Sequence, residues 1–134
     1  MDIVYSATVV DHATKPRNLG TMEKADGFAR RTGTCGDTME LWLNVRDGVI
    51  GQIAFMTDGC GTTLATGSMV TEMARGKKPG VAFKISEQDI LTALGGLPPE
   101  NEHCAALAAD TLKAAISSYL KVKNEPWKNL YGKH

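Results

Sequence analysis

The chain has 134 residues, of which 43% are hydrophobic and 22% charged, values typical of one soluble globular domain. Fifteen basic residues balance fifteen acidic ones, so the chain lacks the basic excess of a nucleic-acid-binding surface, and no apolar run is long enough to cross a membrane. The N-terminus lacks the basic segment of a signal peptide, and three cysteines cannot all pair within one chain. We therefore expect a single domain over residues 1–134, without nucleic-acid or membrane partners, in the reducing cytoplasm.

Hydrophobic periodicity predicts the elements of the first half. Residues 2–12 have apolar side chains at helical spacing. Residues 20–36 are rich in glycine, threonine and charge without a clear period, and we expect a long loop there. Strict alternation predicts a strand at 38–45, and residues 49–57 form the returning strand after the Asp47-Gly48 turn.

The second half is predicted to be helical. Residues 62–75 have helical spacing and Gly76 offers a stop, whereas 77–80 indicates a turn and 81–85 is ambiguous. Ser86 followed by Asp89 is typical of a capping box, and predicts a helix that ends at Gly95-Gly96.

A long helix with one apolar stripe, from Cys104 to Tyr119, follows the rigid connector 97–99, and residues 121–134 are expected to be a loose tail. This order of elements predicts an α+β fold, an antiparallel sheet of about three strands with helices packed on one face.

Each of the three cysteines lies at an expected element boundary. Cys35 precedes the first strand, Cys60 lies between two glycines before a helix, and Cys104 lies near the start of the last helix. The free N–H groups at a helix start favour a thiolate. The separations are much longer than those of Cys-x-x-Cys zinc knuckles.

Two other polar residues accompany these thiols. If the chain is extended at Cys35, the Asp37 carboxylate points to the same side as that thiol. His103 adjoins Cys104 at the helix start, where both side chains can reach a site off its end. Three thiolates with Asp37 or His103 would make a four-ligand site, shallow and at the surface, which suits a cluster that is built and given away.

The same residues also have structural interpretations. A buried cysteine usually packs as a small hydrophobe, His103 alone could bond a helix end, and Asp37 alone could begin a strand. A structural or interaction domain with inert cysteines therefore stays open. A cysteine hydrolase is disfavoured, because no histidine is spaced as the general base of a single activated cysteine.

A set of short motifs runs in order along nearly the whole chain. They are Val10-Asp11-His12, Lys15-Pro16-Arg17-Asn18-Leu19-Gly20, Cys35-Gly36-Asp37, Asp58-Gly59-Cys60-Gly61, Leu97-Pro98-Pro99, His103-Cys104 and Leu107-Ala108. Together they resemble the iron–sulfur cluster assembly scaffold family, the IscU type and the NifU N-terminal domain, within the SufE/NifU superfamily.

The resemblance implies an IscU/NifU-like fold and an assembly scaffold, not an enzyme. Such a scaffold builds a labile 2Fe–2S cluster on Cys35, Cys60, Cys104 and a fourth ligand, for which Asp37 and His103 are the candidates. Sulfur would arrive as a persulfide from a cysteine desulfurase, with Cys104 as the first expected acceptor. The cluster would then pass to an apo-protein or carrier, and Asp37 matches the family's aspartate that is linked to cluster lability.

One departure from the family bears on partners. The chaperone-binding segment of the IscU type reads Leu-Pro-Pro-Val-Lys, whereas Glu100-Asn101 follows Pro99 in this chain. This difference argues against recognition by the dedicated Hsp70-type chaperone. A homodimer is left open.

The alternative function is that of the SufU type, a zinc-bound sulfurtransferase that accepts persulfide sulfur from a cysteine desulfurase. Zinc would be held tetrahedrally by Cys35, Asp37, Cys60 and Cys104. The presence of His103 and the short segment 76–97 favour the scaffold type instead.

Overall fold

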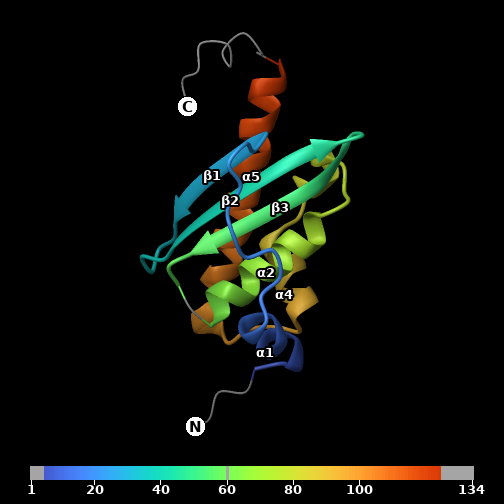
Figure 1. The fold of residues 1–134 in the computed structure, drawn as a ribbon. Coiled ribbons are helices and arrows are strands. Elements are labelled where there is room, and N and C mark those ends of the chain that lie inside the picture. Colours follow the sequence, from blue (N-terminus) through green and yellow to red (C-terminus); the bar gives the residue numbers. More distant parts are fainter. Residues whose placement is uncertain (1–4, 60, 125–134) are drawn as a thin grey trace.

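An antiparallel sheet of three strands carries the helices α2, α4 and α5 on one of its sides (Figure 1). The computed structural model describes residues 5–59 and 61–124. The strands are β1 (Gly27–Thr32), β2 (Thr38–Arg46) and β3 (Val49–Thr57), in the spatial order β1-β2-β3. This architecture confirms the predicted α+β class, its sheet of about three strands and the helices on one face.

The alternating pattern of β2 produces the buried face of the sheet. Met39, Leu41 and Leu43 are fully buried. Leu41 pairs with Phe55 of β3, which is also fully buried. The hairpin between β2 and β3 turns at Asp47 and Gly48, which both have positive φ, as a tight two-residue turn between twisted strands requires. Both strands and their turn are therefore confirmed.

The expected loop at 20–36 is wrong in part, because its second half contains β1. This strand pairs along its whole length with β2, from Gly27 opposite Leu43 to Thr32 opposite Thr38. Its inward positions are Gly27 and Ala29, both buried, and these small residues produce almost no hydrophobic alternation. The strand is stabilised by partners distant in sequence, which local periodicity does not reveal.

The helical elements are α1 (Ala7–Thr14), α2 (Thr62–Ala74), α3 (Pro79–Ala82), α4 (Glu87–Leu94), the 3₁₀ helix η1 (Pro99–Asn101) and α5 (Glu102–Asn124). The four longer helices agree with the prediction in type and differ at several boundaries, whereas α3 and η1 were not predicted as helices. The predicted capping box is present, because Ser86 and Asp89 exchange both of their hydrogen bonds, and Gly95 ends α4 in the left-handed conformation. No helix in the described part of the chain is long and apolar enough to cross a membrane.

Three boundaries differ from the expectation. Helix α1 begins at Ala7, because the Ser6 hydroxyl accepts the Val9 N–H as its N-cap; residues 1–4 lie outside the described part. The turn expected at 77–80 contains the start of α3, where Pro79 occupies a first-turn position that needs no N–H donor. Helix α5 continues to Asn124, beyond the expected start of the tail at 121, and residues 125–134 lie outside the described part.

Two glycines let the helices approach the sheet closely. A Cβ atom at Gly27 of β1 would lie 2.4 Å from the carbonyl oxygen of Ala115 in α5. A Cβ atom at Gly67 of α2 would lie 2.3 Å from the ring of Phe55 in β3. Both contacts fix how closely α2 and α5 lie against the sheet, and the starts of these two helices carry the candidate site.

Candidate functional site

Four segments contribute to the candidate site, and in Figure 1 the first of them, the β1–β2 loop, lies beside the end of β3 at one end of the sheet. They are that loop, the end of β3, the start of α2 and the start of α5. The end of β3 is held to the start of β2, because the Asp58 carboxylate accepts the Thr38 N–H at 2.7 Å and the Thr57 hydroxyl donates to the Thr38 carbonyl oxygen at 2.7 Å. These two hydrogen bonds hold the backbone beside the candidate residues in place.

Asp37 and Cys104 are joined through one threonine hydroxyl. Thr63, in the first turn of α2, donates a hydrogen bond of 2.8 Å to Oδ2 of Asp37. The same Oγ1 lies 3.4 Å from Sγ of Cys104. Thr63 is 1% exposed, so this bridge is shielded from water. Residues from the β1–β2 loop, α2 and α5 are thereby brought to one point.

Two further groups lie against the Cys104 sulfur. The Thr62 hydroxyl is 3.4 Å from Sγ, and Nε2 of His103 is 3.7 Å from the same atom. Cys104 is only 2% exposed, whereas His103 is half-buried. The expected approach of His103 to Cys104 at the helix start is present. The expectation of an entirely shallow site is wrong at Cys104, because the first turn of α2 covers its sulfur.

Cys35 lies in the β1–β2 loop and is exposed. The extended geometry expected for Cys35 and Asp37 is wrong, because the loop is a tight turn. Gly33 donates its N–H to the Asp37 carbonyl oxygen at 2.8 Å, and Gly36 donates to the Gly33 carbonyl oxygen at 3.0 Å. Gly36 has φ +95°, which reverses the chain between the thiol and the carboxylate.

Gly59, which precedes Cys60, packs against the Asp37–Thr63 pair, while Cys60 itself lies outside the described residues. A Cβ atom at Gly59 would lie 2.7 Å from Oδ2 of Asp37 and 2.8 Å from Oγ1 of Thr63. Gly61, on the other side of Cys60, is the N-cap residue of α2 and has φ +54°. Gly59 thus allows a close contact with Asp37 and Thr63, and Gly61 begins α2.

The described residues do not by themselves form a metal site. Among residues 5–59 and 61–124, no group of three or more His, Cys, Asp and Glu side chains lies close enough to hold one ion. Thr63 contacts Asp37 and Cys104, and His103 contacts Cys104, whereas Cys35 is exposed on the β1–β2 loop. The types of donor, thiolate with carboxylate or imidazole, suit zinc and iron–sulfur clusters.

Sequence reasoning missed Thr62 and Thr63, the two hydroxyls that contact Cys104. The only local signal was their place directly after Gly61, in the first turn of a helix whose start was expected to face the site. Threonine is common in such positions for reasons of helix capping, so the signal is weak without the fold.

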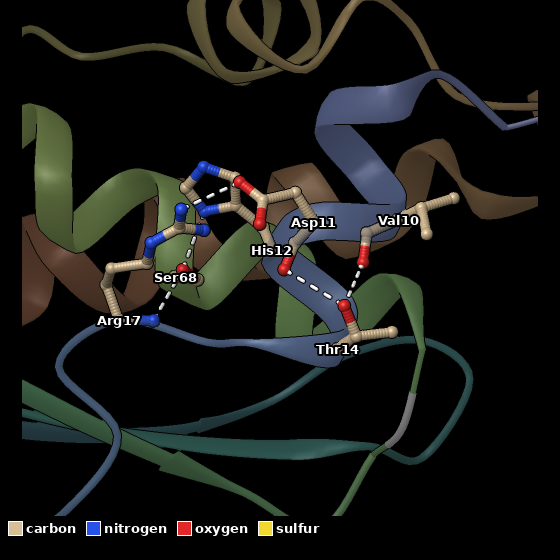
Figure 2. Close-up of polar contacts among 6 residues, drawn as sticks. All are labelled: Val10, Asp11, His12, Thr14, Arg17 and Ser68. Atoms are coloured by element: carbon tan, nitrogen blue, oxygen red, sulfur yellow. Dashed lines mark hydrogen bonds and ion pairs between the residues drawn. The ribbon is translucent and has the colours of Figure 1, made fainter.

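A second polar cluster joins α1 to α2 and the segment that follows α1 (Figure 2). Nδ1 of His12 is 2.7 Å from Oγ of Ser68, which also accepts the Arg17 N–H at 2.9 Å. Arg17 pairs with Asp11 at 2.7 Å, and this ion pair lowers the pKa of the Asp11 carboxyl. Burial of His12, aided by the positive charge of Arg17, lowers the pKa of the imidazole. The cluster holds α1 in place and contains motif residues outside the candidate site.

The sequence matches a family model described as the NifU-like N-terminal domain over residues 4–126. Among similar proteins, the iron–sulfur cluster assembly scaffold protein IscU 1 of Archaeoglobus fulgidus is 45% identical, covering 88% of this chain and 78% of its own length. IscU of Aquifex aeolicus is 41% identical, covering 90% of this chain and 78% of its own. The mitochondrial iron sulfur cluster assembly protein 2 of Saccharomyces cerevisiae is 40% identical, covering 92% and 81% respectively.

Solved structures share the fold at lower identity. The FiSufU protein of the SUF system from Fervidobacterium islandicum AW-1 superposes with a TM-score of 0.70 at 20% identity, covering 84% of this chain and 96% of its own. The N-terminal part of a NifU-like protein from Brucella abortus has a TM-score of 0.68 at 18% identity, covering 87% and 94%. The sequence matches, which cover most of both chains, are the stronger finding: the chain belongs to the family of NifU-like N-terminal domains, together with the IscU-type scaffold proteins.

Proposed function

We propose that this protein is a scaffold for assembly of a labile 2Fe–2S cluster, which it passes to apo-proteins or a carrier. The observation that carries the proposal is a chain of contacts from Asp37 through Thr63 to Cys104, against which His103 also lies. The similarity of this chain to relatives named as cluster assembly scaffolds supports the same function. On this proposal the protein binds and releases its cargo and is not an enzyme.

The proposed cluster ligands are Cys35, Cys60 and Cys104, with Asp37 or His103 as the exchangeable fourth. Cysteine thiolates are the usual ligands of iron–sulfur clusters. The three cysteines come from separate segments, and Cys35 lies on an exposed turn. A cluster held in this way can be released by moving one loop without unfolding the core. An oxygen or nitrogen ligand at the fourth position exchanges more readily than a thiolate, which suits transfer.

Sulfur delivery is proposed to use a cysteine desulfurase as the partner. The Cys104 thiolate would attack the outer sulfur of the desulfurase persulfide, forming the Cys104 persulfide and releasing the desulfurase thiolate. Because Cys104 is 2% exposed, this step requires the β1–β2 loop or the start of α2 to move aside. We place the protein in the cytoplasm, where thiols stay reduced, although relatives of this family include mitochondrial proteins.

The alternative is a zinc-bound sulfurtransferase that uses the same donors. Its support is the chemistry of the set itself, because three thiolates and a carboxylate also make a tetrahedral zinc site. The two proposals differ in what the protein holds after sulfur transfer. A scaffold accumulates iron and sulfide together, whereas a sulfurtransferase keeps zinc and accelerates the desulfurase.

The test is anaerobic reconstitution with iron, cysteine and a cysteine desulfurase, followed by visible absorption spectroscopy and iron and sulfide analysis. The expected result is an iron–sulfur spectrum that is lost in each of Cys35→Ser, Cys60→Ser and Cys104→Ser. A colourless protein that retains zinc and increases desulfurase turnover would replace the scaffold proposal with the sulfurtransferase.

A further inference from the structure

The Thr63 hydroxyl has one proton, and the structure directs that proton to Asp37. The bond to Oδ2 of Asp37 is 2.8 Å long, and Thr63 is 1% exposed on a regular helix. Asp37 follows the turn that contains Gly36. Its backbone carbonyl oxygen is held by the Gly33 N–H, and its carboxylate accepts the hydrogen bond from Thr63. The rigid partner of this contact is therefore Thr63, and the side chain that it orients is Asp37.

The surroundings show that this contact is tightly packed. Gly59 leaves no space for a Cβ atom, which would lie within 2.8 Å of both Oδ2 of Asp37 and Oγ1 of Thr63. Oγ1 of Thr63 also lies 3.4 Å from Sγ of Cys104. One hydroxyl thus sets the position of a carboxylate relative to a thiol from a different element.

We propose that Thr63 is a positioning residue for the metal ligand Asp37, an inference that rests on the donor set of the proposed function. The hydrogen bond holds Oδ2, and the other carboxylate oxygen of Asp37 would be available to a metal. Hydrogen-bond partners of metal-binding carboxylates fix ligand orientation, and their loss typically lowers metal affinity by about 10–100-fold. Thr63 acts through Asp37 and does not bind the metal itself.

The test measures zinc affinity of the reduced apo-protein by competition with a chromophoric chelator, so it does not depend on cluster assembly. Thr63→Val removes the hydroxyl and preserves the side-chain shape, and Thr63→Ser restores the hydroxyl. We expect Thr63→Val to weaken zinc binding by about 10–100-fold, and Thr63→Ser to remain near wild type. Thr111→Val, a buried threonine on α5 whose hydroxyl bonds the Leu107 carbonyl oxygen, should not change the affinity.

A double-mutant cycle separates action through Asp37 from a general packing effect. In the Asp37→Ala background, Thr63→Val should weaken zinc binding no further. A further loss in that background, equal affinities of Thr63→Val and wild type, or a Thr63→Ser variant as weak as Thr63→Val would overturn the inference. If Thr63→Val does not fold, Thr63→Ala alone and in the Asp37→Ala background provides the cycle.

The same titration distinguishes failure of the proposed donor set from failure of the proposed role of Thr63. Wild-type protein that binds no zinc, or binds it equally well after Cys104→Ser, would overturn the donor set and the role of Thr63 with it. Zinc binding that is lost in Cys104→Ser and unchanged in Thr63→Val would overturn only the role of Thr63.

Discussion

Gly59 lies so close to Asp37 that a Cβ atom at position 59 would be 2.7 Å from Oδ2 of that carboxylate. We therefore predict that Gly59→Ala displaces the Asp37–Thr63 pair and weakens zinc binding in the same direction as Asp37→Ala. Chelator competition measures the effect. Gly80→Ala is the matched control, because no heavy atom lies within 4 Å of a Cβ at that position. Wild-type zinc affinity in Gly59→Ala would show that the pair is not needed in this arrangement.

Asp37→Ala should make the assembled cluster slower to leave. The Asp37 carboxylate is the proposed exchangeable ligand. In its absence we expect His103, which already contacts Cys104, to become the fourth ligand of the cluster. The measurement is the rate of cluster transfer to an apo-ferredoxin, followed by visible absorption. Asp110→Ala is the control, because Asp110 is an exposed acid whose ion pair with Arg31 at 3.6 Å contributes little. Equal transfer rates for Asp37→Ala and wild type would remove Asp37 from the exchange step.

Acidification should loosen the contact between α1 and α2 through His12. Its pKa is lowered in the folded state, by burial and by the charge of Arg17, so the unfolded chain binds the proton more readily. The free energy of unfolding should therefore fall as the pH decreases below about 6.5, the ordinary pKa of histidine. Urea unfolding between neutral and mildly acidic pH measures this slope. His12→Gln should flatten it, and an unchanged slope in that variant would assign the pH dependence to other groups.

Gly27→Ala should destabilise the fold. The added Cβ would lie 2.4 Å from the backbone carbonyl oxygen of Ala115, and a backbone atom of α5 cannot rotate away as a side chain can. Overpacking of this kind typically costs about 1–3 kcal/mol. Urea unfolding of Gly27→Ala beside Gly80→Ala measures the difference. A free energy of unfolding equal to that of the control would mean that α5 shifts along β1 without cost.

The elements that could be predicted from sequence are those whose signal is local. Strand β2 alternates cleanly because one of its faces is buried, and α4 has both a capping box and a glycine stop. Strand β1 could not be predicted, because its inward residues Gly27 and Ala29 are small and its order comes from pairing with β2 and packing under α5. The short α3 was missed for a similar reason, since four residues are too few to show a period.

The sequence by itself determined which residues are candidates for the chemistry. The cysteines, Asp37 and His103 could be selected because thiols, carboxylates and imidazoles at element boundaries are rare and chemically distinctive. Only the tertiary structure decided how they are arranged: a tight turn separates Cys35 from Asp37, Cys104 is buried, and Thr63 joins Asp37 to Cys104. Thr63 is 26 residues from Asp37 and 41 from Cys104, so its role depends on contacts that exist only once the sheet and both helices have packed together.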